Sequence, residues 1–305
     1  MSRAEDLAAA YAGVRPRLVR AAYAVLGTLV EAEDVVSDTW LRLVEADDRQ
    51  TVTSVEAWAT VAVVRRAVDV LGSARVRREM YVGPWLPEPD VAPLDGGHTE
   101  ADPADQVTLD ESVSFALLVV LEALTPAERT AWVLHDLFGM PFDQVATTVG
   151  RTPAAVRQLA SRARRRVAAG TPRVAVDGAE HRKVVEAFTR AAAAGDFAGL
   201  LAVLDPDVIL TNDGGGEVSA ARRPVSGADR VARFLLGIAS KQRGGHRVDL
   251  VIVNGAVGVA VSDDDGLVLV GSLTVRDALI GRVDLVLAPA KLARSSARLL
   301  PRTPT

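Results

Sequence analysis

One segment, Thr152 to Val167, restricts the possible folds of this chain more than any other. Its sequence, TPAAVRQLASRARRRV, places apolar residues at helical spacing on one side and arginines on the others. Such a helix buries its apolar side and offers guanidinium groups to a partner. Between Arg151 and Ala168 there are six arginines and no acidic residue, whereas the whole chain has a formal net charge of −4. The concentrated basic charge predicts a polyanionic partner.

The residues before this helix complete a helix-turn-helix pattern. Thr125 to Glu128 combine an N-cap threonine, a proline at the first helical position and a glutamate three residues after the cap, so a helix begins there and ends at Gly139. Pro141 to Val149 is typical of a short helix, and a tight turn at residues 150–152 leads into the arginine helix. This spacing is typical of DNA-binding domains. We expect the domain to span residues 108–170.

The N-terminal residues predict a separate all-helical domain over 1–82. Apolar residues at near-helical spacing run from Leu7 to Leu26, where Gly27 is a natural C-terminal cap. A second helix, about Ala32 to Glu45, places several apolar residues near one face, namely Val35, Val36, Trp40, Leu41 and Val44. A third runs from about Val55 to Ala74, with Ser54 or Thr53 as N-cap, and leads into the basic sequence SARVRR.

A linker, residues 83–107, separates the two helical domains. It contains Pro84, Pro87, Pro89, Pro93 and Pro103, which we expect to prevent regular structure. From Glu88 to Glu111 the chain has eight acidic residues and no Lys or Arg. Self-repulsion would extend such a segment, and its charge resembles that of a nucleic-acid strand. A solvated spacer is the alternative interpretation.

The remaining residues predict an α+β domain over 178–294, followed by a tail at 295–305. Three stretches have the apolar spacing of helices: His181 to Ala194, Phe197 to Leu204 and about Val231 to Ala239. The sequences VDLVIV, AVGVAV, LVLVGSLTV and LIGRVDLVL are typical of strands. Asn254-Gly255 and Asp265-Gly266 supply the positive φ of tight hairpin turns. We therefore expect helices packed on a curved antiparallel sheet.

Composition and charge exclude several classes of protein. The chain has no cysteine, which excludes disulfides and zinc-thiolate sites and favours a cytoplasmic location. Its most apolar run, Val113 to Leu121, is too short to cross a bilayer. Residues 1–170 contain 18 arginines, no lysine and 24 acidic residues, a net charge of −6. Any DNA contact must therefore come from local arginine clusters, and we expect a second protein to supply further binding energy.

Three stretches resemble the extracytoplasmic-function (ECF) bacterial sigma factors. They are AEDVVSDTWLRLVEA (Ala32 to Ala46), EAWATVAVVRRAVDVLGSARVRRE (Glu56 to Glu79) and LTPAERTAWVLHDLFGMPFDQVATTVGRTPAAVRQLASRARRRV (Leu124 to Val167). The remainder is similar to the SnoaL-like, cone-shaped α+β domain fused to one sigma subgroup, through WLPEP (Trp85 to Pro89) and DGGGEVSAARRPVSG (Asp213 to Gly227). The sequence LAPAKL at residues 287–292 lacks the acidic residue that commonly precedes its lysine in that subgroup. The resemblance implies a multidomain chain with two all-α sigma domains, the second a helix-turn-helix, followed by the α+β domain.

The resemblance also implies partners and contact residues. The partners are core RNA polymerase, through its β′ clamp helices and β flap, and promoter DNA. Residues Asp34, Asp38 and Trp40 would dock on the clamp helices, although Trp40 also suits the domain's own core. The minus-10 element would be opened on a surface formed by Trp58, Arg65, Arg66, Arg75, Arg77 and Arg78, with Trp58 the most core-like of them. The acidic linker would thread toward the polymerase cleft, with Asp95, Asp102 and Asp105 as contributors.

The same resemblance places the arginine helix in the major groove of the minus-35 element. Arg157, Gln158 and Arg162 are the candidates for base contacts. Arg151, Thr152, Arg165 and Arg166 suit backbone phosphates, which position a helix without specifying sequence. For Arg164 to Arg166, a solvated basic helix end is the alternative interpretation.

We expect the C-terminal domain to be regulatory. Related cone-shaped domains include cyclases and isomerases, so Asp213, His181 and His246 are the candidates for acid and base chemistry. A single aspartate in a glycine-rich loop is a weak signal, and Gly214 to Gly216 lack the Lys-Ser/Thr of a phosphate loop. The sequence therefore predicts a sigma factor without catalysis, cofactor or metal. The alternatives are a DNA-binding regulator independent of polymerase and a SnoaL-like enzyme.

Overall fold

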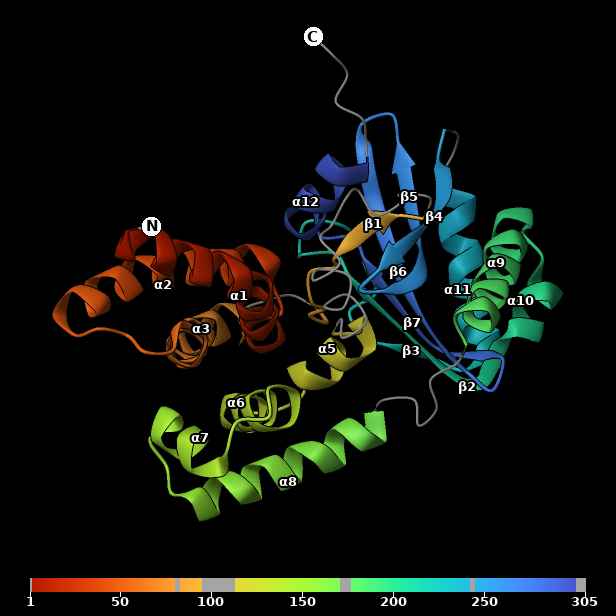
Figure 1. Ribbon diagram of the computed structural model, residues 1–305. Helices are drawn as coiled ribbons and strands as arrows, with labels where there is room; N and C mark the ends of the chain where they lie inside the picture. The colour runs from red at the N-terminus through yellow and green to blue at the C-terminus, as the bar shows by residue number, and fades with distance from the viewer. Residues whose placement is uncertain (1, 80–82, 95–112, 171–176, 242–244, 300–305) are drawn as a thin grey trace, which may run out of the picture. The chain divides into compact units, whose positions relative to one another are not determined.

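The computed structural model describes residues 2–79, 83–94, 113–170, 177–241 and 245–299 (Figure 1). The chain divides into two compact units. The first is made chiefly of Met1–Glu79 and Leu117–Thr171, and the second of Pro172–Thr305 together with residues 83–94. Among the described residues, no helix has both the length and the hydrophobicity needed to span a bilayer.

Three helices form the N-terminal part of the first unit: α1 (Arg3–Leu26), α2 (Leu29–Arg49) and α3 (Val55–Glu79). Helix α1 begins at a capping box between Ser2 and Glu5, which the sequence analysis missed. It ends at Gly27, which has a φ of 72°, as predicted. Each of the three predicted helices is confirmed, and each is longer than expected.

The second group of helices follows the predicted helix-turn-helix order. It contains α5 (Phe115–Glu122), α6 (Pro126–Trp132), α7 (Phe142–Val149) and α8 (Pro153–Gly170). The predicted capping box of α6 is present, with the Thr125 hydroxyl accepting from the Glu128 N–H at 3.3 Å. Residues Val133–Leu137 wind as a π-helix, η1, which the sequence pattern did not predict.

The sequence predicts these two groups as separate domains, but in the structure they share one hydrophobic core. Arg129 on α6 is 3% exposed, and its Nη1 donates to the Val25 carbonyl at 2.9 Å and to Glu122 Oε1 at 2.7 Å. This contact ties α6 to the C-terminal end of α1. The helix-turn-helix is therefore packed against the first three helices rather than held at a distance from them.

The second unit is built on a seven-stranded sheet in the order β1-β4-β5-β6-β7-β2-β3. The strands are β1 (Val91–Pro93), β2 (Leu204–Asp213), β3 (Val225–Ser226), β4 (Arg247–Val253), β5 (Ala256–Asp263), β6 (Gly266–Arg276) and β7 (Leu279–Val286). The expectation of a purely antiparallel sheet is wrong, because β2 pairs with β7 in parallel. The long connection from β2 to β7, which includes a helix and the β4–β6 meander, permits this pairing.

Helices pack on both sides of this sheet (Figure 1). The buried residues of α9 (Gly178–Ala194), α10 (Phe197–Val203) and α11 (Ala228–Lys241) form one core with the inward side chains of β2, β5, β6 and β7. Helix α12 (Pro289–Leu299) contacts β6 and β1. The predicted tail at 295–305 is therefore wrong in its first residues, since α12 continues to Leu299 and buries Ser295.

The turns between strands follow the predicted chemistry in part. Asn254 and Gly255 both have positive φ, 48° and 82°, as predicted for the β4–β5 turn. At the β5–β6 turn only Gly266 has positive φ. Asp277 and Ala278 form a third turn with φ of 49° and 61°, although neither is glycine. Asp tolerates positive φ but Ala rarely adopts it, so this pair is a weaker turn signal than Asn-Gly.

Candidate nucleic-acid interface

Helix α8 has the two-sided character that the sequence predicts. Its buried stripe consists of Val156, Leu159, Ala160 and Ala163. The predicted DNA-contacting residues are all exposed: Arg151, Thr152, Arg157, Gln158, Arg162, Arg165 and Arg166. Because the apolar stripe packs inside the first unit, the guanidinium groups lie on its surface.

The N-terminal end of α8 is fixed by the turn before it. The hydroxyl of Thr152 accepts the N–H of Ala155 at 3.3 Å, as expected of an N-cap. Gly150 ends α7 with a φ of 64° and turns the chain between the two helices. The direction of α8 is therefore set by two short-range contacts that the sequence predicted.

The arginines of α8 differ in their contacts. The guanidinium carbon of Arg157 lies 5.4 Å from the centroid of the Phe142 ring on α7, a cation–π contact that leaves its N–H groups without a carboxylate partner in the described chain. Arg164 pairs with Asp136, and Nη1 of Arg166 lies 2.9 Å from Glu128 Oε2. Arg164 and Arg166 are therefore exposed, as a solvated basic helix end requires, but each is also held by a carboxylate of the first unit.

The pair with Arg166 belongs to the capping box of α6. Burial raises the pKa of the Glu128 carboxyl, but hydrogen bonds from Thr125 and the positive charges of Arg166 and Arg162 outweigh burial, so its net pKa is lowered. The carboxylate therefore remains ionised and holds Arg166 against the helix-turn-helix. This structural role was not visible in the sequence, because Glu128 precedes Arg166 by 38 residues.

The predicted minus-10 residues are only partly accessible. Trp58 is half-buried and packs on the core of the first unit, which fits the core interpretation. Nη2 of Arg65 donates to the Thr147 carbonyl on α7 at 3.2 Å. Nε of Arg66 lies 3.7 Å from Asp38 on α2. Arg75, Arg77 and Arg78 belong to α3, and their side chains lie outside the described part of the structure.

A second exposed surface, which we call the α2 face, carries the predicted protein-binding acids. Asp34 and Asp38 are exposed, while Trp40 is half-buried with its ring centroid 5.2 Å from that of Tyr11. Leu41 was predicted to lie near one face with Val35 and Val36, but it is 62% exposed whereas those two residues are buried. Residues 34, 38 and 41 lie on one side of α2 because of their spacing. The α2 face therefore combines two carboxylates with an exposed apolar side chain, so a partner with basic and apolar groups could complement it.

The predicted linker does not behave as a spacer over its first part. Residues 91–93 form β1, which pairs antiparallel with β4 and includes Pro93. The prediction that prolines exclude regular structure here is wrong, because Pro93 lies in an edge strand. Leu86 and Val91 are buried in the second unit. The predicted contributors Asp95, Asp102 and Asp105 lie outside the described residues.

A buried ion pair holds this segment, and we call it the linker clasp: Trp85, Leu86, Asp213 and Lys291. Nζ of Lys291 lies 2.6 Å from Asp213 Oδ2, 2.5 Å from the Leu86 carbonyl oxygen and 3.2 Å from the centroid of the Trp85 ring. The Leu86 N–H donates to Asp213 Oδ2 at 2.8 Å. The WLPEP, DGGG and LAPAKL motifs thus meet at one buried point. Sequence reasoning missed the role of Lys291.

The clasp also bears on the enzymatic alternative. Asp213 is 0% exposed, and its second carboxylate oxygen accepts the Gly215 N–H at 3.0 Å. A carboxylate bound in this way is poorly placed to exchange protons with a substrate. Nε2 of His181 lies 2.8 Å from the Val257 carbonyl oxygen, and His246 is half-buried. No group of His, Cys, Asp and Glu within the described residues is arranged to hold a metal.

Comparisons with known proteins agree with these features. The family model of sigma-70 region 2 matches residues 10–77, and that of sigma-70 region 4 matches residues 114–167. The chain is similar to the ECF RNA polymerase sigma factor SigJ of Mycobacterium tuberculosis, with 37% identity over 97% of this chain and 96% of the relative. A probable ECF sigma factor, SigI, from the same species is 39% identical over 77% of this chain and 78% of its own length. The crystal structure of SigJ matches with a TM-score of 0.74 at 36% identity, covering 93% of this chain and 96% of that one.

Proposed function

This chain belongs to the extracytoplasmic-function family of RNA polymerase sigma factors, and we propose that its exposed helix α8 reads the minus-35 element of its promoters. As a sigma factor it directs core RNA polymerase to promoter DNA. The observation that carries the proposal is the side of α8 opposite its buried stripe, where Arg157, Gln158 and Arg162 are exposed. Arginine and glutamine can each contact a base edge in the major groove through two hydrogen bonds.

The remaining exposed groups at α8 suit the DNA backbone. Arg151 and Thr152 lie at the N-terminal end of the helix, where backbone N–H groups also favour phosphate. Arg165 is exposed without a carboxylate partner among the described residues. Arg166 would have to share its guanidinium between Glu128 and a phosphate.

The proposed minus-10 surface can bind DNA together with α8 only if the first unit opens. This surface consists of Trp58, Arg65, Arg66, Arg75, Arg77 and Arg78. The two promoter elements are separated by about 25 base pairs, or roughly 85 Å at about 3.4 Å per base pair. A compact unit of this size has a radius of gyration of about 14 Å, and Arg65 contacts the carbonyl of Thr147 within it. We therefore propose that α3 and α7 separate when both elements are bound.

Core polymerase is the partner that suits the α2 face. Acidic Asp34 and Asp38 would pair with basic residues of the β′ clamp helices, and Leu41 would be buried between them. Trp40 lies on the same helix and packs against Tyr11 of α1, so it contributes to the core beneath this face. The β flap is the proposed contact of the helix-turn-helix domain, and the proposed place of action is the cytoplasm.

Replacing Leu41 with alanine should weaken binding to core polymerase about tenfold while leaving the stability of the chain unchanged. The side chain is largely exposed in the free protein, so its loss costs little on folding, whereas burial at an interface is worth on the order of 1–2 kcal/mol. Binding of labelled chain to purified core enzyme measures the effect. Leu201→Ala is the matched control, because Leu201 is an exposed leucine of the second unit. Equal binding by both variants would contradict the proposed surface.

The fused α+β domain is proposed to regulate initiation through the linker, with no catalysis of its own. Supporting this role, the linker clasp fixes Trp85 and Leu86 on that domain. If the linker must reach the polymerase cleft, any change that stabilises or releases the clasp also changes how freely the linker can reach it. The carboxylate of Asp213 is occupied by structural contacts, which favours regulation over acid-base chemistry.

Deleting residues beyond 178 should change promoter-specific transcription by a reconstituted enzyme. Without the domain, Leu86 and Val91 lose the surfaces that bury them, and the linker is no longer held. Transcription from one promoter by core enzyme with the full or the truncated chain measures the change, and co-elution with core confirms that both chains bind. Equal output from the two complexes would reject the regulatory role.

A further inference from the structure

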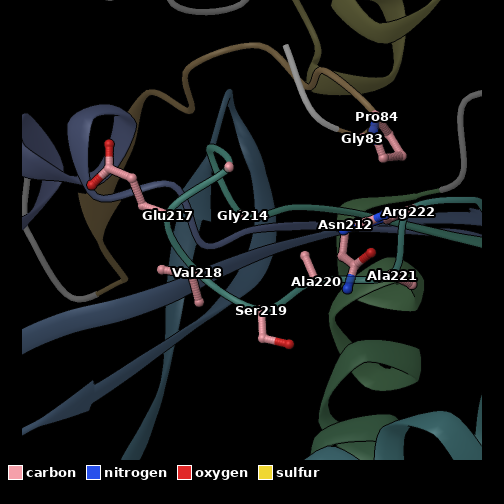
Figure 2. Close-up of a pocket in the computed structure, with 11 residues that line it drawn as sticks. Gly83, Pro84, Asn212, Gly214, Glu217, Val218, Ser219, Ala220, Ala221 and Arg222 are labelled. Atoms are coloured by element: carbon pink, nitrogen blue, oxygen red, sulfur yellow. The ribbon is translucent and has the colours of Figure 1, made fainter.

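The second unit contains a polar pocket that the proposed function does not use. It has a volume of about 350 Å³ and lies between the glycine-rich loop after β2 and the start of the linker segment (Figure 2). Its walls include Pro84, Asn212, Gly214, Ser219, Ala220 and Arg222. This volume is within the range of about 300–1,000 Å³ that is usual for small-molecule sites.

Asn212 is the unusual residue of this pocket. It is 2% exposed, and its amide oxygen Oδ1 is buried with no hydrogen-bond partner among the described residues. Side chains alternate along a strand, so Asn212 points to the opposite face of β2 from Thr211 and Asp213. Both neighbours are satisfied, Thr211 by Arg282 at 3.2 Å and Asp213 by the clasp.

An unpaired buried amide weakens a folded protein, because its hydrogen bonds to water are lost without replacement. An apolar residue of similar size would serve folding better at this position. The loop beside it is also closely packed, since a Cβ on Gly214 would lie 2.2 Å from the Val218 carbonyl oxygen. A closely packed loop beside an unsatisfied amide in a pocket of this size indicates a binding site.

We propose that this pocket binds a small organic molecule through a carboxamide or lactam group. Because Oδ1 is buried in the free protein, the Asn212 side-chain amide would have to turn its edge toward the pocket. The N–H of the ligand would then donate to Asn212 Oδ1, and its carbonyl oxygen would accept from the Asn212 side-chain N–H. Two amides pair in this reciprocal way because each has a donor beside an acceptor. A carboxylate cannot supply the donor at neutral pH, and Arg222 is exposed, so solvent and salt screen its attraction for an anion.

The position of the pocket gives its ligand a route to the linker. Gly83 and Pro84 form part of its wall and directly precede Trp85 of the linker clasp. The binding proposal stands on the pocket alone and does not depend on how the chain acts in transcription.

Ligand-observed saturation-transfer NMR on the full-length chain tests the proposal with benzamide, 2-pyrrolidone and benzoate as probes. Benzamide and 2-pyrrolidone should bind saturably in the millimolar range, as expected for such small probes. Benzoate, which lacks the N–H donor, should bind at least about tenfold more weakly, the equivalent of one lost hydrogen bond. The Asn212→Leu variant should lose binding of the two amides.

Two further variants separate binding from folding. Thr211→Val changes the adjacent buried residue on the other face of β2, so it should lower the melting temperature and leave probe binding intact. Asn212→Leu should melt at the wild-type temperature or above it, because it removes an unpaired polar group. Ala220→Leu fills the pocket from another wall and should also abolish binding.

The proposal is overturned if neither amide saturates the wild-type chain, or if benzoate binds as tightly as benzamide. It is also overturned if Asn212→Leu and Ala220→Leu leave the affinity of benzamide unchanged. A large fall in the melting temperature of Asn212→Leu would show that the amide is structural and would likewise contradict the assignment.

Discussion

Replacing Lys291 with methionine is expected to destabilise the second unit by about 3–5 kcal/mol, the usual cost of removing one partner from a buried ion pair. The ammonium group contacts the Asp213 carboxylate, the Leu86 carbonyl and the Trp85 ring, and it is 7% exposed. Methionine fills similar space but leaves the charge of Asp213 buried beside an unpaired carbonyl. Urea unfolding followed by the fluorescence of Trp85 in a chain whose other tryptophans are replaced measures the loss.

A second ion pair of α12 provides the control. Nη1 of Arg298 lies 2.7 Å from Asp90 Oδ1, with both side chains 46% exposed. An exposed pair of this kind contributes roughly 0–1 kcal/mol, so Arg298→Ala should unfold nearly as the wild type does. Equal stability of Lys291→Met and Arg298→Ala would show that the clasp does not hold the linker. In the double variant Asp213→Asn with Lys291→Met, much of the lost stability should return, because the buried charge has been removed.

Replacing Arg157 and Arg162 together with alanine should reduce promoter-specific transcription by about thirtyfold or more while leaving binding to core polymerase unchanged. Each base contact through two hydrogen bonds is worth about 1–3 kcal/mol, and about 1.4 kcal/mol corresponds to tenfold. Both residues are exposed on α8 and the stripe beneath them is untouched, so the helix should fold normally. Run-off transcription together with a core-binding assay separates the two activities.

Arg164→Ala is the matched control on the same helix. Arg164 is paired with Asp136, so it is already engaged within the helix-turn-helix. Its loss should lower stability slightly and leave the choice of promoter unchanged. If Arg164→Ala impaired transcription as much as the double variant, helix integrity rather than base contact would explain the effect. If the double variant also lost core binding, the assignment of α8 to DNA would be wrong.

Several features that depend on neighbouring residues were predicted from the sequence, although the capping box at Ser2 and the turn at Asp277 were not. The capping box at Thr125, the N-cap at Thr152 and the buried stripe of α8 each follow from side chains within a few positions of one another. The turn at Asn254-Gly255 follows from the tolerance of those two residues for positive φ. Local chemistry decides such features, so the surrounding fold does not change them.

Features that depend on distant residues were not predictable. The clasp is formed by hydrogen bonds that join Leu86 to Asp213 and Lys291, which follow it in the sequence by 127 and 205 residues. The proline-rich, acidic composition of residues 83–94 favours a spacer, and only the fold brings its partners to it. The same reason explains the pairing of Arg166 with Glu128 and the parallel pairing of β2 with β7. The exposure of Leu41 was not predictable either, because apolar periodicity does not distinguish a buried face from a binding face.

If α8 reads the minus-35 element, this chain gives core RNA polymerase its promoter specificity through that helix. The most direct measurement is transcription by purified core enzyme on fragmented genomic DNA, with the wild-type chain, the Arg157→Ala/Arg162→Ala variant or no added chain. We expect a defined set of transcripts with the wild-type chain, sharing two upstream sequence elements, and loss of that set with the variant. A transcript pattern that is the same with and without the chain would contradict it.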